Sequence, residues 1–91
     1  MSIGNLQNGQ FKQMSATANI KASQGVLLGF FVSSTTAGTI AIYDDPAAGT
    51  TTKIIDTLTP TVLGWYTLPA AFTTGCNVVI GGALQVTMVY V

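Results

Sequence analysis

Very few residues of this 91-residue chain have side chains suited to acid–base, nucleophilic or metal chemistry. Asp44 and Asp45 are adjacent, Asp56 follows them, and Cys76 is the one cysteine, while histidine, glutamate and arginine are absent. Enzymes draw their general bases mainly from histidine and glutamate, and a serine or cysteine nucleophile needs such a base beside it. We therefore predict that the protein is not an enzyme, with no catalytic residue and no cofactor.

The three aspartates are the only acidic residues, and Asp56 joins the other two only if the strands that carry them pair. A calcium site needs six to eight oxygen ligands, and the short loop after Asp45 offers few, so we predict no metal site. Asp44 or Asp45 is expected to cap the turn before Pro46. In that role Asp44→Asn should be tolerated better than Asp44→Ala, and a pair between Asp44 and Lys53 stays open as an alternative.

Cys76 stands just before the apolar run Val78–Ile80 and has no histidine to lower its pKa. We interpret it as a small buried apolar residue. One cysteine permits no disulfide within the chain, which is typical of proteins kept in a reducing compartment.

Trp65 and Tyr66 are neighbours in an expected strand, so one side chain must point inward and the other outward. The simplest interpretation is a core Trp65 and a surface Tyr66. The alternative is an aromatic side chain at a binding face, for sugar or for protein. Sugar sites surround the ring with acidic, amide and arginine side chains that are scarce here, so protein contact is favoured.

The N-terminal segment, residues 1–12, is rich in Gly, Asn and Gln and has no periodic apolar face. We predict an extended arm there, followed by one β domain over residues 13–91. Ile3, Leu6 and Phe11 are the sizeable apolar residues of this segment, and together with Trp65 and Tyr66 they form our set of candidate interface residues.

Strand patterns fill the rest of the chain. Apolar and polar residues alternate over Phe11–Ala22, and two apolar runs flank Thr35–Gly38, which predicts a β-hairpin over Gly25–Asp45. Further strands are expected over Thr51–Leu58, over Gly64–Leu68 and on either side of a tight turn at Gly81-Gly82. Seven to eight short strands and no helix indicate an all-β sandwich or small barrel.

Composition excludes several partners. Charged residues make up 7% of the chain with a net charge of zero, so no basic patch for nucleic acid is expected. The longest apolar run, Val26–Val32, is far shorter than the roughly 20 residues that span a bilayer, and no secretory leader is recognisable, which favours a protein made in a cytoplasm. A 91-residue chain with so little charge would gain from burying its surface in interfaces.

A family resemblance is carried by four sequence segments, which begin at Gly25, Gly38, Gly64 and Gly82. They contain the short motifs "Ile-Tyr-Asp", "Leu-Pro-x-x-Phe-x-x-Gly" and "Val-Thr-x-x-Tyr". Over about residues 20 to 91 the chain resembles small virion proteins of tailed bacteriophages, most of all capsid decoration (cement) proteins. The resemblance implies a jelly-roll-like antiparallel β-sandwich that assembles as trimers or dimers. Of the two we predict a homotrimer, because symmetric closure hides apolar surface.

The resemblance also implies a place of action. The expected location is the phage capsid surface of the virion, after synthesis in the host cytoplasm, and the expected partners are the major capsid protein and further copies of the chain, without nucleic acid or membrane. A tail, fibre or baseplate component and a small carbohydrate-binding module remain as alternatives.

Overall fold

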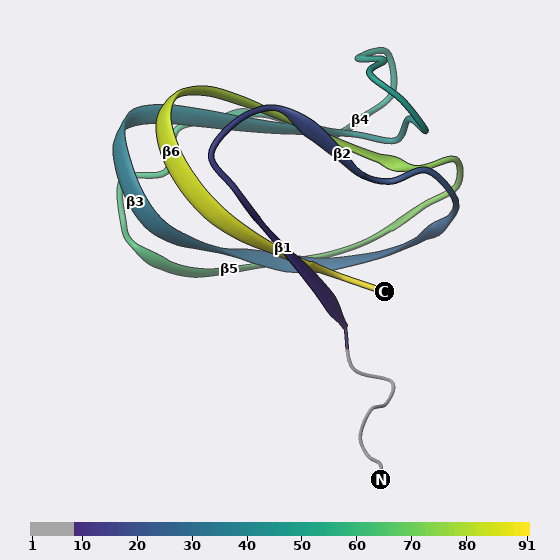
Figure 1. Cartoon of the computed structure of the whole chain (residues 1–91), viewed down its shortest axis with the longest axis horizontal. Helices are drawn as coiled ribbons and strands as arrows, with labels where there is room; N and C mark the ends of the chain where they lie inside the picture. The colour runs from purple at the N-terminus through teal and green to yellow at the C-terminus, as the bar shows by residue number, and fades with distance from the viewer. Residues whose placement is uncertain (1–8) are drawn as a thin grey trace, which may run out of the picture.

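The computed structural model describes residues 9–91, and over this range the protein is all-β, with every strand pair antiparallel and no helix (Figure 1). The described residues thus contain no helix that could cross a membrane. The strands are β1 (Gln10–Met14), β2 (Ala18–Lys21), β3 (Gly25–Tyr43), β4 (Lys53–Leu58), β5 (Gly64–Phe72) and β6 (Cys76–Tyr90).

The long strands β3 and β6 organise the sheet. They pair with each other from Leu27 opposite Tyr90 to Tyr43 opposite Asn77, and every other strand pairs with one of them. β1 and β5 flank one end of this pair, and β2 and β4 flank the other end. Figure 1 shows β3 and β6 curving together, so that a lower half with β1 and β5 faces an upper half with β2 and β4.

The hairpins predicted around Thr35–Gly38 and at Gly81-Gly82 are wrong, because the chain continues through both segments in one strand. Both segments instead mark the bend of the sheet, since Ala37 lies opposite Ala83 and the register shifts there. Ala37 and Gly82 have φ angles of 56° and 68°, in the left-handed region. This region is typical of turns and also of β-bulges, so the same residues can bend two paired strands instead of reversing each one.

The strand predicted over Phe11–Ala22 is also wrong as a single element, because it is divided into β1 and β2. The two pieces pair with different ends of β6, Met14 with Val86 and Ala18 with Val78. Between them the hydroxyl of Thr17 accepts a hydrogen bond from the backbone N–H of Ile80 (2.9 Å). The chain therefore leaves the ladder where β6 bends and rejoins it beyond the bend.

The prediction that β5 would end before Pro69 is wrong as well, since the strand runs on to Phe72. Proline lacks an N–H and is tolerated in edge strands and at bulges. β5 pairs only with β3 among the described strands, and its register shifts between the Leu27 and Gly29 pairs, where Pro69 falls. The six strands of residues 9–91 are thus fewer and longer than the seven to eight expected.

The core lies between the two halves of the bent sheet. Its side chains come from alternate positions of the long strands, as the pleat of a strand with one buried face requires. Burying a large aliphatic or aromatic side chain contributes about 1.5–3 kcal/mol, so these residues hold the halves together. The fully buried members include Leu27, Phe30, Val32, Ile40, Ile42, Phe72, Val78, Leu84, Val86 and Met88.

Candidate functional site

Asp44, at the end of β3, is held by the turn between β5 and β6. Its Oδ2 accepts hydrogen bonds from the N–H (2.9 Å) and hydroxyl (3.0 Å) of Thr73, and its Oδ1 from the N–H and hydroxyl of Thr74 (both 2.9 Å) and the N–H of Gly75 (3.4 Å). These hydrogen bonds hold the pKa of Asp44 well below its usual value, and those from the backbone N–H groups of Thr73 and Thr74 have the largest effect. Both carboxylate oxygens act as acceptors, so Asp44→Asn, which turns one of them into an NH₂ donor, is expected to lose some of these hydrogen bonds.

Asp45 is the residue that caps the turn before Pro46. Its Oδ1 accepts hydrogen bonds from the N–H groups of Ala47 (2.8 Å) and Gly49 (3.0 Å), which confirms the predicted capping role for this member of the pair. The capped loop is closed at its base by a hydrogen bond from the N–H of Asp44 to the carbonyl of Thr52 (2.8 Å).

Two asparagines anchor the same loop to the sheet. Asn19 of β2 and Asn77 of β6 lie directly opposite each other. The Nδ2 of Asn19 donates to the carbonyls of Asp45 and Ala47 (both 2.9 Å), and the Nδ2 of Asn77 donates to the carbonyl of Gly49 (3.1 Å). Neither asparagine is among the residues predicted from the sequence. The sequence feature that could have identified them is an amide side chain within an apolar strand, where a buried amide must find a hydrogen-bond partner.

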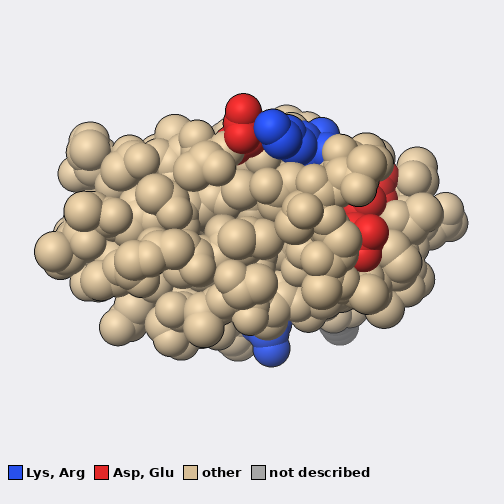
Figure 2. Space-filling model, turned by 90° about the horizontal axis from the view of Figure 1, so that it is seen from above, with Lys and Arg blue, Asp and Glu red and all other residues tan. Residues whose placement is uncertain are grey.

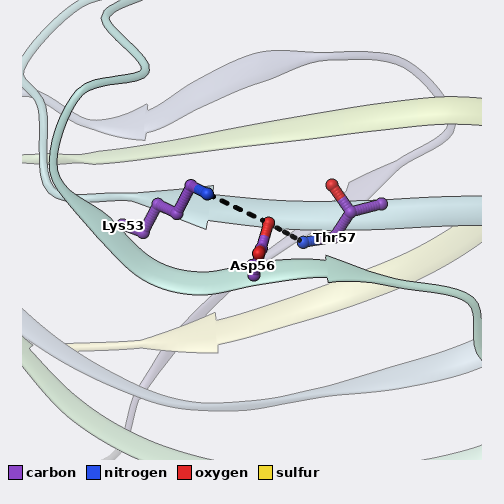
Figure 3. A network of polar contacts seen from close by, with 3 residues as sticks. All are labelled: Lys53, Asp56 and Thr57. Carbon is purple, nitrogen blue, oxygen red and sulfur yellow. Dashed lines mark hydrogen bonds and ion pairs between the residues drawn. The ribbon is translucent and has the colours of Figure 1, made fainter.

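Asp56 does not join the other aspartates. In Figure 3 its Oδ1 lies 3.3 Å from the Nζ of Lys53 and accepts a hydrogen bond from the N–H of Thr57 (2.7 Å). These contacts lower the pKa of Asp56, and the hydrogen bond from Thr57 has the largest effect. Lys53 is thus paired with Asp56 and not, as the alternative had it, with Asp44. No group of three or more acidic, cysteine or histidine side chains suited to a metal occurs within residues 9–91.

Cys76 is completely buried, in agreement with its interpretation as a small apolar core residue. Burial, together with the negative charge of Asp44, raises the pKa of the thiol to about 12. The group therefore stays a neutral thiol at physiological pH, and a neutral thiol is a poor nucleophile.

Trp65 points outward and Tyr66 inward, so the interpretation of a core Trp65 and a surface Tyr66 is wrong. The Trp65 side chain is 49% exposed, and its Nε1 donates to the hydroxyl of Thr67 (2.7 Å). The Tyr66 ring stacks on Phe30 at a centroid distance of 5.2 Å, and its hydroxyl donates to the carbonyl of Val62 (2.7 Å). Of the two aromatic residues, Trp65 is thus the one exposed on the surface.

Trp65 belongs to a surface on the outside of the lower half, which we call the outer apolar face. None of its residues is charged. Its exposed large apolar members are Phe11 at 74%, Trp65 and Phe31. Two neighbouring rows of directly opposite residues make up this face: Phe11, Val89, Gly29 and Thr67 in the first, and Gln13, Thr87, Phe31 and Trp65 in the second.

Gly29 leaves the space that the Trp65 ring occupies on this face. A Cβ at position 29 would come within 2.7 Å of Cζ2 of Trp65 and even closer to the carbonyl oxygen of Tyr66. Contiguous exposed apolar surface of this kind is typical of a protein contact site, and aromatic residues dominate the energetics of such sites.

A groove with a volume of about 290 Å³ separates β4 from β5. Its wall on the β5 side carries Tyr66 and Leu68, its wall on the β4 side carries Ile55 and Leu58, and Phe30 contributes from β3. The remaining lining residues are Asp56, Thr57 and Thr67. The volume is at the lower end of the range for small-molecule sites, so the groove suits one or two side chains better than a large ligand.

Charged side chains are sparse on the view in Figure 2, where they lie at the top and bottom edges and in one acidic group towards the right, and leave a wide uncharged area on the left. Of the predicted interface residues, the structure places Phe11 and Trp65 on the outer apolar face and Tyr66 in the groove. Ile3 and Leu6 lie outside the described residues. Phe11 itself is part of β1, which crosses the boundary expected between residues 12 and 13.

Comparison with protein-family models, with curated proteins and with solved structures found no significant match to this chain.

Proposed function

We propose that the protein is a structural component of a tailed bacteriophage particle, a capsid decoration or cement protein that acts by binding capsid subunits and further copies of itself. The sequence resemblance supports the kind of particle. The observation that carries the mode of action is the outer apolar face, which spans four adjoining strands without a charged residue and exposes Phe11 on β1, Phe31 on β3 and Trp65 on β5.

Within this proposal the bent sheet acts as a jelly-roll-like sandwich whose halves support a rigid outer surface. Exposed aromatic side chains lose little conformational entropy on binding, and a few of them supply most of the energy of an interface. A homotrimer would place several such faces on one particle-bound unit. Because many copies bind the same shell, weak single contacts would add up to strong attachment.

The same face argues against a carbohydrate-binding module. Sugar hydroxyls need hydrogen-bonding groups around an aromatic ring, and the Trp65 Nε1 is already bonded to Thr67. The other polar side chains of the face are those of Thr67, Thr87 and Gln13, and none of its residues has the acidic or arginine side chain typical of a sugar site. A protein surface of similar character is a better complement, in the head as we propose or in a tail, fibre or baseplate as the alternative.

The double variant Phe11→Thr/Trp65→Thr tests this function. Threonine suits a strand and keeps the surface uncharged, so the fold should persist while most of the apolar contact is lost. We expect self-association, measured by sedimentation, to weaken at least tenfold, which corresponds to about 1.4 kcal/mol, and occupancy on purified phage heads to fall.

The matched control is Val62→Thr/Leu63→Thr, which removes exposed apolar side chains outside the outer apolar face. This control variant should retain the self-association of the wild type and its occupancy on phage heads. Unchanged association and occupancy of the Phe11/Trp65 variant would overturn the proposal, and recovery of the protein with tails instead of heads would favour the tail alternative.

A further inference from the structure

The groove between β4 and β5 lies where two strand edges are left unpaired. Each of these strands pairs with β3 on one side, and neither pairs with another strand of residues 9–91 on the other. An unpaired edge exposes backbone N–H and C=O groups that can accept an added extended segment. The groove therefore combines backbone pairing sites with an apolar lining.

The lining sets the chemistry of the occupant. Phe30, Tyr66 and Leu68 form an apolar floor, and Leu58, 37% exposed, stands at the rim. The one charged residue, Asp56, is already paired with Lys53. An uncharged extended segment with one or two aliphatic side chains fits this site, whereas a charged segment would find no free partner in it.

Such a segment exists in this chain. Residues 1–8 contain no charged side chain and carry two large aliphatic residues, Ile3 and Leu6. We propose that this segment of one copy docks in the β4–β5 groove of a second copy. The inference rests on the self-association part of the proposed function and names a contact that contributes to it.

The strand order argues for a second copy. β1 and β5 lie at opposite edges of the lower half, in the order β1, β6, β3, β5. Three strand spacings amount to about 14 Å, whereas the three residues from Gly9 back to Leu6 span at most about 11 Å. This short link does not favour Leu6 in the groove of its own chain, whereas exchange between copies allows both aliphatic residues to approach a groove.

Intermolecular paramagnetic broadening tests the proposal on the full chain. A nitroxide is attached through Ser2→Cys, which is selective because Cys76 is fully buried. Spin-labelled protein without ¹⁵N is mixed with unlabelled ¹⁵N protein, so that any broadening must come from another copy. We expect the amide signals of Thr57, Leu58 and Thr67 to lose intensity in the mixture.

Two variants of the ¹⁵N partner sharpen the test. Leu58→Glu places a charge in the groove and should abolish the broadening. Val26→Glu adds the same charge at a residue of similar exposure, 39%, outside the groove, and should leave the broadening intact. Both spectra also report directly whether the variant is folded.

Broadening seen only when label and ¹⁵N share one chain would overturn the exchange. Absence of broadening from a protein that still self-associates in sedimentation would overturn the inference and leave the proposed function standing. A monomer without broadening would count against both.

Discussion

The upper half ends in the loop that contains Asp44 and Asp45, which we call the loop end. The loop end and the outer apolar face of the lower half differ in how far their surface groups find partners within the protein. At the loop end, Asp44 alone accepts five hydrogen bonds, and two opposed asparagines hold the Asp45–Gly49 backbone. On the outer apolar face, Phe11 and Trp65 expose large areas that no part of residues 9–91 covers. The most conspicuous polar residues therefore serve the fold, and the surface available for a partner is apolar.

Among the variants that test this contrast, Gly29→Ala should cause the largest loss in the free energy of unfolding, because it disturbs the outer apolar face and the fold together. The new Cβ would collide with Trp65 and with the backbone of Tyr66 at a φ of +156°. We expect a loss of about 2–3 kcal/mol in the free energy of unfolding, measured by denaturant titration with Trp65 fluorescence as the local signal.

Gly64→Ala is its control. Gly64 also has a positive φ, +131°, but a Cβ there meets nothing within 4 Å. The difference between the two variants isolates the collision, and equal losses would show that backbone strain alone is responsible.

Asn77→Ala should have the next largest effect, now at the loop end. The side chain is 2% exposed, and its removal leaves the Gly49 carbonyl without its donor. We expect about 1–2 kcal/mol of destabilisation and faster amide exchange within Asp45–Gly49. Sedimentation should be unchanged, and a loss of self-association would break the separation between the two regions.

Asp44 makes the loop end sensitive to acid. The pKa of Asp44 is lower in the folded state than in the unfolded state. The Asp44 carboxylate therefore contributes its full stabilisation of the fold at a pH above the unfolded pKa. This contribution is lost as the pH falls through the unfolded pKa toward the lower folded pKa. We expect the Tm of the wild type to fall more steeply below about pH 4 than that of Asp44→Asn.

Near neutral pH, Asp44→Asn should itself have a lower Tm than the wild type, because one of its two acceptor atoms becomes a donor. Asp44→Ala should lower the Tm further. Parallel pH profiles of the wild type and Asp44→Asn would contradict the assigned hydrogen bonds.

The smallest effect is expected for the pair of Lys53 and Asp56, which are 52% and 74% exposed. Exposed pairs contribute little because water and salt screen them. Lys53→Gln should leave the Tm unchanged within error, at low and at high salt. A clear salt-dependent loss would show that the pair does more than the geometry indicates.

The sequence predicted the all-β class, the capping role of Asp45 and the burial of Cys76, because each depends on local composition or on neighbours in the chain. It mispredicted the course of β3 and β6. The signals at Thr35–Gly38 and Gly81-Gly82 favour positive φ, and only their placement opposite each other decides that they bend a strand pair instead of ending four strands.

The site residues divide in the same way. Alternation showed that Trp65 and Tyr66 point to opposite sides, but which one is buried depends on Gly29 and Phe30 across the strand pair. The roles of Asn19 and Asn77 likewise depend on register. Chain-local patterns do not contain this information, since it arises only when distant segments pair.

The pairing of β3 with β6 also governs the order of events in folding. Leu27 pairs with Tyr90 and Tyr43 with Asn77, so the contacts that join both halves of the sheet span long stretches of chain. Proteins dominated by such non-local contacts fold slowly, typically in milliseconds to seconds. Because both halves share β6, neither half can close before β6 has left the ribosome. The newly made chain therefore exposes its apolar strands until β6 is released, and chaperones have a period in which to bind it before it assembles.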